Sequence, residues 1–156
     1  MKTQNRRLKM AGLLGATLAL GGFVHNAHAE SQFKGAQAKK AHYEAIFQID
    51  SDAQGTMKKT LNNIENALHD PRLAGKIEIE LIANSKGYKV YQKGNGFEKL
   101  LRHLRSEGVI LAQCSNTLRE LKVDKKTLYS FISFVPSGAG EIILREGNGW
   151  AYVHPS

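Results

Sequence analysis

From residue 43 onward, the chain alternates between two apolar patterns. In segment 76–83, isoleucine and leucine alternate with glutamate, which is the two-residue period of a β-strand. In segment 57–68, apolar residues return every three or four positions, which is the period of an amphipathic helix. The run 109–112 is apolar throughout, as is typical of a parallel strand covered on both faces.

These patterns predict strands that alternate with helices. The expected strands are 43–50, 76–83, 109–112, a stretch within 130–135, and 150–154; the expected helices are 57–68, 97–104, 115–121 and 139–146. This order is typical of α/β domains, so we expect a three-layer α/β/α sandwich with a mainly parallel sheet of about five strands. The glutamates in 76–83 predict a strand with one exposed face, near the edge of the sheet.

The first 29 residues have the composition of a secretory signal. Basic residues come first without an acidic one, an uncharged stretch covers residues 10–24, and the small-x-small pattern Ala27-His28-Ala29 follows. The uncharged stretch is short and rich in glycine, whereas a bilayer span needs about 20 apolar residues. We therefore expect a cleavable signal at residues 1–29 and export to the periplasm, with no stable membrane anchor after cleavage.

Removal of this signal changes the charge of the chain. Four of the 22 basic residues are lost and all 14 acidic residues remain, so the net charge falls from +8 to +4. The remaining basic residues are dispersed, and we expect no nucleic-acid partner. The polar segment 30–42 is expected to be a flexible leader, and residues 43–156 are long enough for a single domain.

Cys114 is the only cysteine of the chain, and its position points to chemistry. It ends an expected strand, and Ser115, Asn116 and Thr117 after it favour the start of a helix. A thiol at such a junction faces backbone N–H groups and the positive end of a helix dipole, both of which stabilise the reactive thiolate. The alternative of a small buried residue with a packing role stays open.

Other polar residues are expected near this thiol. In open parallel sheets, ligands bind where loops leave the carboxyl ends of the strands. The expected strands end near Asp50, Asn84 and Pro136, so these loops should share one rim with Cys114. We take Cys114 as the catalytic candidate and the following residues as candidate binding residues: Asn84, Ser115, Asn116, Thr117, Ser137 and Gly138.

The sequence offers no metal or cofactor motif. The histidines beyond the expected signal lack metal-ligand spacing; they are His42, His69, His103 and His154. The glycine-rich segment 93–96 lacks the ending of a phosphate-binding loop and the glycine pattern of a dinucleotide-binding turn. We therefore expect neither a metal ion nor a cofactor.

Two runs of the sequence resemble a known family. They are GVILAQCSNTLRELKV, which contains Cys114, and FVPSGAGEIILREGNGWAYVHP near the C-terminus. The chain resembles the DsrE-type (DsrE/DsrF-like) sulfur-relay family over about residues 43–155, and in particular its small stand-alone members. The resemblance implies a three-layer α/β/α fold with a parallel sheet, assembled as trimers or hexamers.

The resemblance also implies an activity. In the sulfur-relay members, a cysteine directly after the third strand accepts sulfur as a persulfide, and Cys114 matches that position. A sulfur carrier or sulfurtransferase would exchange sulfur with a donor or acceptor protein or with a small sulfur compound. The expected export, and Glu120-Leu121 where those members often carry a basic residue and glycine, depart from the pattern, so partner recognition does not carry over. A non-catalytic oligomeric module that binds a small ligand or a protein, with a structural cysteine, stays open.

A homo-oligomer is expected from the resemblance and from the glycine-rich segment 84–96. Such a segment is hard to bury, and it carries large aromatic side chains. We expect Tyr88, Tyr91 and Phe97 to be exposed and to contact other copies of the chain.

Overall fold

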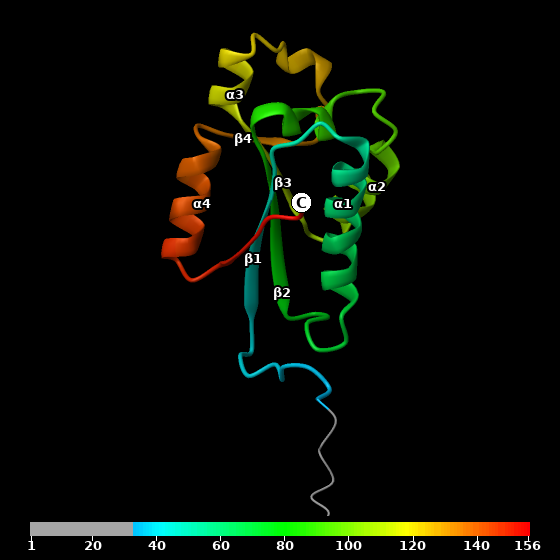
Figure 1. Cartoon of the computed structure of the whole chain (residues 1–156), viewed down its shortest axis with the longest axis vertical. Coiled ribbons are helices and arrows are strands. Elements are labelled where there is room, and N and C mark those ends of the chain that lie inside the picture. The colour runs from blue at the N-terminus through cyan, green and yellow to red at the C-terminus, as the bar shows by residue number, and fades with distance from the viewer. Residues whose placement is uncertain (1–32) are drawn as a thin grey trace, which may run out of the picture. The chain divides into compact units, whose positions relative to one another are not determined.

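The computed structural model describes residues 33–156 of the chain. The signal expected at residues 1–29 and the first residues of the expected leader lie outside the described residues. Residues 36–156 form one folded unit, and residues 36–42 hold no helix or strand (Figure 1). None of the helices within residues 33–156 has the length and apolar character needed to cross a bilayer.

Strands and helices alternate along the folded unit, as the sequence predicts. The strands are β1 (Tyr43–Ile49), β2 (Ile77–Ala83), β3 (Ile110–Cys114), β4 (Ser133–Val135) and β5 (Ala151–Val153). The α-helices are α1 (Gln54–His69), α2 (Glu98–Ser106), α3 (Ser115–Glu120) and α4 (Gly138–Gly147), and two 3₁₀ helices are η1 (Ser85–Tyr91) and η2 (Lys125–Thr127).

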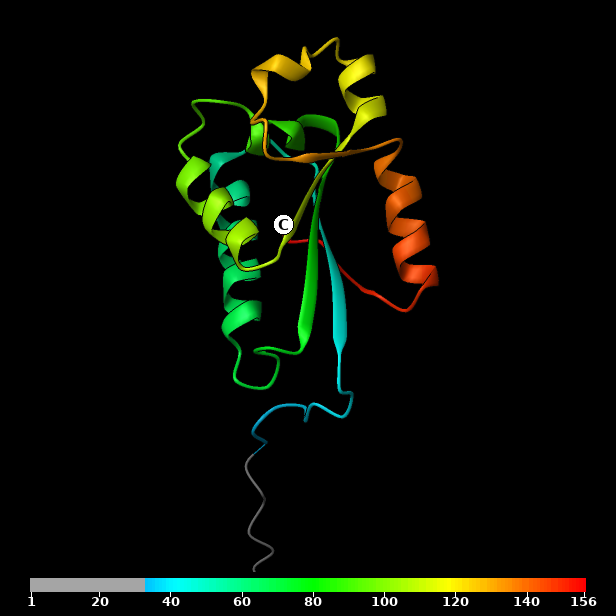
Figure 2. The ribbon, with the colours of Figure 1, turned by 180° about the vertical axis from the view of Figure 1, so that it is seen from behind.

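The strands form one parallel sheet in the order β4-β3-β2-β1-β5. Helices α1 and α2 cover one face of this sheet and α4 covers the other, which Figures 1 and 2 show from opposite sides. The predicted α/β fold with a parallel sheet between helical layers is therefore confirmed. The parallel direction of all the strands brings their carboxyl ends to one rim, next to α3 and η1.

Strand β2 lies at the centre of the sheet, so the prediction that it lies near an edge is wrong. Its Glu80 is only 1% exposed because Arg145 of α4 reaches it, with Nη2 2.7 Å and Nε 2.8 Å from Oε2. Burial raises the pKa of Glu80, and the positive charge of Arg145 opposes that rise. Glu80 thus reflects a buried ion pair and not contact with water, whereas Glu78 near the start of the strand is partly exposed.

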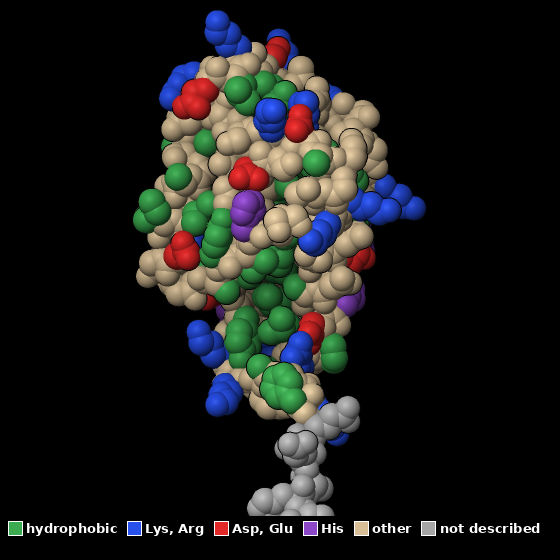
Figure 3. Space-filling model, viewed as in Figure 1, with side chains coloured by type: hydrophobic (Ala, Val, Ile, Leu, Met, Phe, Trp, Pro, Cys, Tyr) green, Lys and Arg blue, Asp and Glu red, His purple; other side chains and the backbone are tan. Residues whose placement is uncertain are grey.

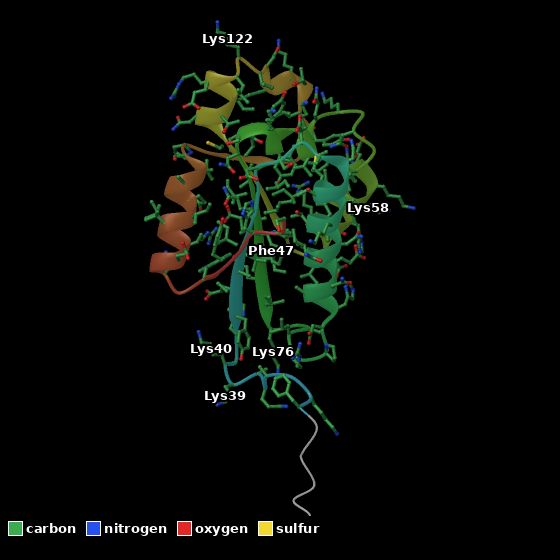
Figure 4. The ribbon with its side chains drawn as sticks, viewed as in Figure 1. Lys39, Lys40, Phe47, Lys58, Lys76 and Lys122 are labelled. Carbon is green, nitrogen blue, oxygen red and sulfur yellow. The ribbon has the colours of Figure 1, made fainter. Side chains whose placement is uncertain are left out.

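The two faces of the sheet are packed unequally. The face under α1 and α2 carries the larger apolar core, in which Phe47 points from β1 into the space between the sheet and α1 (Figure 4). The face under α4 carries a small apolar cluster of Ile46, Ile82, Ala112 and Trp150. Arg145 also lies over the Trp150 ring, 4.0 Å from its centroid. The position of α4 therefore depends strongly on this one arginine.

Gly87 fixes η1 against the end of β1. A β-carbon at this position would lie 2.0 Å from the backbone oxygen of Ile49, a distance that only a shift of the backbone could relieve. The same oxygen accepts a hydrogen bond of 3.1 Å from the N–H of Asn84. The absence of a side chain at Gly87 thus lets the chain after β2 fold closely over the rim.

Replacement of Arg145 should destabilise the protein strongly. In Arg145→Met, Glu80 stays buried without its counter-charge, and we expect the free energy of unfolding in urea to fall by about 3 kcal/mol. The double variant Glu80→Gln/Arg145→Met should recover much of that loss, because no unpaired charge remains in the core. Arg105→Met, at an exposed arginine of α2, should change stability by less than about 0.5 kcal/mol. Equal losses of unfolding free energy in Arg145→Met and Arg105→Met would contradict the importance of the ion pair.

Candidate functional site

Cys114 lies at the carboxyl end of β3, an interior strand, and is also the N-cap residue of α3. Its sulfur accepts a hydrogen bond from the N–H of Thr117 at 3.4 Å. The sulfur therefore takes the place in which an oxygen of serine or aspartate commonly caps a helix. The residue is 5% exposed, so only a small part of its surface meets solvent at the rim.

Several hydrogen-bond donors surround this sulfur. Burial acts to raise the pKa of the Cys114 thiol, but hydrogen bonds from the side chain and N–H of Thr117, and from the N–H groups of Gly138 and Asn116, lower it more. The pKa of the thiol is therefore below its ordinary value. Donors stabilise the negatively charged thiolate more than the neutral thiol, so the surroundings favour the reactive form.

Gly138 brings the start of α4 into contact with the thiol. A β-carbon added to Gly138 would lie 3.3 Å from Cβ of Cys114 and 3.2 Å from Cβ of Asn84, closer than side chains normally pack. The hydroxyl of Ser137 caps α4 by accepting a hydrogen bond of 3.2 Å from the N–H of Gly140. Because residue 138 has no side chain, its backbone N–H can approach the sulfur.

The residues after β2 approach the sulfur from the other side. The N–H of Ser85 donates a hydrogen bond of 3.0 Å to the hydroxyl oxygen of Thr117. Ser85 has a φ of +48°, in the left-handed region that few residues other than glycine adopt. The Thr117 side chain thus links the chain after β2 to α3, and it also lowers the pKa of the Cys114 thiol.

The structure brings most of the candidate residues together. Asn84, Asn116, Thr117 and Gly138 surround Cys114. Ser137 acts as a helix cap, and Ser115 is the first residue of α3, with no hydrogen bond from its side chain in the described part of the chain. Asn116 acts here through its backbone N–H, which also donates to the oxygen of Pro136 at 3.2 Å.

Two polar residues of this rim were missed by the sequence reasoning. Gln48 of β1 donates from Nε2 to Oδ1 of Asn84 at 2.9 Å, and the hydroxyl of Tyr152 of β5 donates to Oε1 of Gln48. Next to them, Nε2 of His154 lies 3.2 Å from Oδ1 of Asp50. The feature of the sequence that could have indicated this contact is Gln48 itself, a polar residue between the buried Phe47 and Ile49.

No group of three or more His, Cys, Asp or Glu side chains within residues 33–156 is arranged to hold a metal ion. The labelled lysines are spread over different parts of the surface, and none of them lies beside Cys114. Lys39, Lys40 and Lys76 lie at the end of the sheet opposite to α3, Lys58 points away from α1, and Lys122 lies beyond α3 (Figure 4).

The expected exposure of the aromatic residues in segment 84–97 is wrong for Tyr91. Tyr91 is fully buried, and its hydroxyl donates a hydrogen bond of 2.7 Å to the oxygen of Leu81. Tyr88 and Phe97 are partly buried against the larger core, because η1 folds back over the sheet. Within the folded unit, large apolar side chains are instead exposed on α4, on the edge strands and directly after α3: Ile143, Leu144, Phe134, Tyr152 and Leu121. Self-association stays a prediction.

One edge of the sheet also carries apolar surface. Strand β5 pairs with β1 only at Ala45, Ile46 and Phe47, so the first residues of β1 have no strand beside them on that edge. The face shown in Figure 3 carries a patch of apolar side chains over this lower part of the sheet. The patch lies away from the rim that holds Cys114.

Comparisons with known proteins show a family relationship. No protein-family model and no curated protein matches the chain. A solved structure, that of the protein of unknown function MTH1491 from Methanobacterium thermoautotrophicum, matches with 32% identity and a TM-score of 0.68. The match covers 72% of this chain and 99% of MTH1491. The chain belongs to the same family as MTH1491. Because the function of MTH1491 is unknown, the relationship establishes the family and the fold but no activity.

The pH dependence of alkylation should reveal the lowered pKa of Cys114. The rate of reaction of the native protein with iodoacetamide should rise with pH around a midpoint below that of the same protein unfolded in urea, because the native surroundings favour the thiolate. Thr117→Val removes a hydroxyl donor and should move this midpoint upward, because the thiolate loses stabilisation. Thr127→Val, in η2, should leave it unchanged. A midpoint equal to that of the protein unfolded in urea would contradict the proposed environment.

A side chain at position 138 should disturb the contact between α4 and the thiol. Gly138→Ala forces its β-carbon against two others, and we expect a loss of about 1 to 3 kcal/mol in the free energy of unfolding. Gly147→Ala, at the other end of α4, meets no atom within 4 Å and should be neutral or stabilising by up to about 1 kcal/mol. Equal stabilities of the two variants would show that the contact is unimportant.

Proposed function

We propose that the chain is a DsrE-type sulfur carrier or sulfurtransferase in which Cys114 accepts a sulfur atom as a persulfide. The observation that carries the proposal is the hydrogen bond of 3.4 Å that the Cys114 sulfur accepts from the N–H of Thr117 at the start of α3, in surroundings that lower the pKa of the thiol although burial alone would raise it. The same donors that cap α3 also stabilise the anion that a reaction at the sulfur needs. The position of the thiol at the carboxyl end of an interior parallel strand adds support, because ligands bind at such rims.

The reaction needs no external oxidant. The thiolate of Cys114 attacks the sulfane sulfur of a donor, and a bond forms between Sγ and that sulfur. The bond that joined this sulfur to the rest of the donor breaks, and its electron pair leaves with the donor as a thiolate or as sulfite. In the return step, the thiolate of an acceptor attacks the outer sulfur, and Cys114 leaves as a thiolate. A lowered pKa aids Cys114 as leaving group in that second step.

The donors around Cys114 serve both steps. The N–H groups of Asn116, Thr117 and Gly138 belong to backbone that the starts of α3 and α4 hold in place. Fixed dipoles stabilise an anion without having to reorganise during the reaction. The same groups therefore stabilise the free thiolate before transfer and the thiolate that is released afterwards.

We propose the periplasm as the site of this reaction. The proposal rests on the signal expected at residues 1–29, which lies outside the described residues. Because Cys114 is the only cysteine, the chain cannot protect its thiol in an internal disulfide.

A second candidate is a non-catalytic binding module in which Cys114 only packs. The exposed fraction of 5% favours this alternative, since much of the thiol is covered. The two candidates differ in what the thiol does: a sulfur carrier must take up sulfur at Cys114, whereas a binding module must keep its ligand when this residue is replaced.

Intact mass measurement should separate the two functions. After incubation with thiosulfate or a persulfide donor, the processed protein should gain the mass of one sulfur atom, and dithiothreitol should remove it. Cys114→Ala should gain nothing while keeping its thermal stability to within a few degrees. An unmodified wild-type protein, under conditions in which free cysteine forms persulfide, would favour the binding module.

A further inference from the structure

Helices α1 and α2 leave a groove between them on the surface of the protein. The two helices lie side by side over one face of the sheet (Figures 1 and 2). The groove has a volume of about 500 Å³, which is within the usual range of sites for small molecules. The side chains that line it are Lys58, Asn62, Phe97, Lys99, Leu100 and His103. None of the residues around Cys114 lines this groove, so it is separate from the candidate site at the rim.

The floor of the groove is apolar. Phe97 and Leu100 are partly buried and pack against the larger core. The surface that each of them leaves uncovered contributes to the groove. An aromatic ring at such a floor favours a flat partner, because stacked rings gain energy beyond the area that they bury. The floor therefore suits a ligand that carries an aromatic group.

The walls of the groove are positively charged. Lys58 lines it from α1 and Lys99 from α2, and no Asp or Glu is among the lining residues. Within residues 33–156, the only lysine in an ion pair is Lys89, so the charges of the two lining lysines are not compensated. Lys58 extends from α1 towards solvent, which brings its ammonium group to the mouth of the groove (Figure 4).

The acidic side chains close to the groove contact other basic groups. Oε1 of Glu98, at the start of α2, lies 2.8 Å from Nη2 of Arg102. Oε1 of Glu65 of α1 lies 3.5 Å from Nε2 of His103. Both carboxylates thus have partners other than the two lining lysines. The uncompensated charge of the groove favours a ligand that is itself negatively charged.

We propose that the groove between α1 and α2 binds a small aromatic carboxylate of one or two rings. The rings lie on Phe97 and Leu100, and the carboxylate lies between the ammonium groups of Lys58 and Lys99, which come from different helices. This binding site does not rest on the proposed function, because neither Cys114 nor any group around it takes part.

The first arm of the test uses three probes that separate charge from apolar contact. Naphthoate, the neutral naphthalenemethanol and acetate are each titrated into the processed protein at low ionic strength, and amide chemical shifts are followed by NMR. We expect naphthoate to bind about fivefold or more tightly than the alcohol, the combined effect of two exposed ion pairs. Acetate, which lacks the apolar group, should cause no saturable shifts. Sodium chloride should weaken the binding of naphthoate and not that of the alcohol.

The location of the shifts decides whether this groove is the site. The shifts caused by naphthoate should centre on Asn62, Leu100 and His103. Shifts centred outside α1 and α2, or no binding of naphthoate at about 1 mM, would overturn the proposed site. Equal affinities of naphthoate and naphthalenemethanol would overturn the preference for an anion.

The second arm removes the charges and the ring separately. Lys58→Gln/Lys99→Gln should lower the affinity for naphthoate about fivefold and leave the affinity for naphthalenemethanol unchanged. Phe97→Leu keeps an apolar floor without the ring, and should lower the affinity for both probes severalfold. Lys39→Gln/Lys40→Gln removes the same amount of charge at the end of the sheet opposite to α3, and should change neither affinity.

Thermal melting followed by circular dichroism checks that each variant is folded. Equal losses of naphthoate affinity in the two double lysine variants would show an effect of net charge alone and would contradict the site. Unchanged naphthoate affinity in folded Lys58→Gln/Lys99→Gln would contradict the role of these lysines. The probes contain no sulfane sulfur, so this test fails or succeeds independently of sulfur uptake at Cys114.

Discussion

The ion pair between Glu80 of β2 and Arg145 of α4 fixes the second helical layer of this protein. The face of the sheet under α4 offers only a small apolar cluster, far less than the core under α1 and α2. Arg145 compensates by contacting Glu80, Glu141 and the ring of Trp150 together. One oxygen of Glu80 still has no hydrogen-bond partner among the described residues, so the charge of Arg145 is its main compensation.

The position of one part of the candidate site depends on this attachment of α4 to the sheet. Helix α4 begins at Gly138, whose N–H is one of the donors that lower the pKa of Cys114. The other donors come from α3, which continues directly from β3. The thiol therefore lies between the start of α3, which follows its own strand β3, and the start of α4, which the ion pair of Arg145 with Glu80 holds against the sheet. A shift of α4 would remove a donor without changing any residue that contacts the sulfur through α3.

Much of the fold could be predicted from the sequence because most strands and helices have clear local patterns. Most residues of β1 and β3 are apolar, and several of the turns between elements carry glycine or proline. The interior place of β2 could not be predicted, because the partner of Glu80 lies 65 residues further along the chain. Tyr91 was misjudged for a similar reason: its burial depends on the contact of Gly87 with β1, which no local pattern reveals.

Part of the candidate site could also be predicted, because it depends on the direction of the strands. Parallel strands bring their carboxyl ends together, so the order of strands in the sequence already places Asn84, Cys114 and Gly138 at one rim. The contribution of Gln48 and Tyr152 depends on a contact between residues 104 positions apart, on strands that become neighbours only in the folded sheet.

Gly87 offers a way to recognise the shared fold in more distant related sequences independently of any reaction at Cys114. Its contact with the oxygen of Ile49 belongs to the scaffold and does not involve the sulfur, so descent with this architecture should preserve a glycine there whatever the protein does. Cys114 carries no such geometric requirement. A descendant with the glycine but without the cysteine would mark a branch that kept the scaffold and lost the thiol.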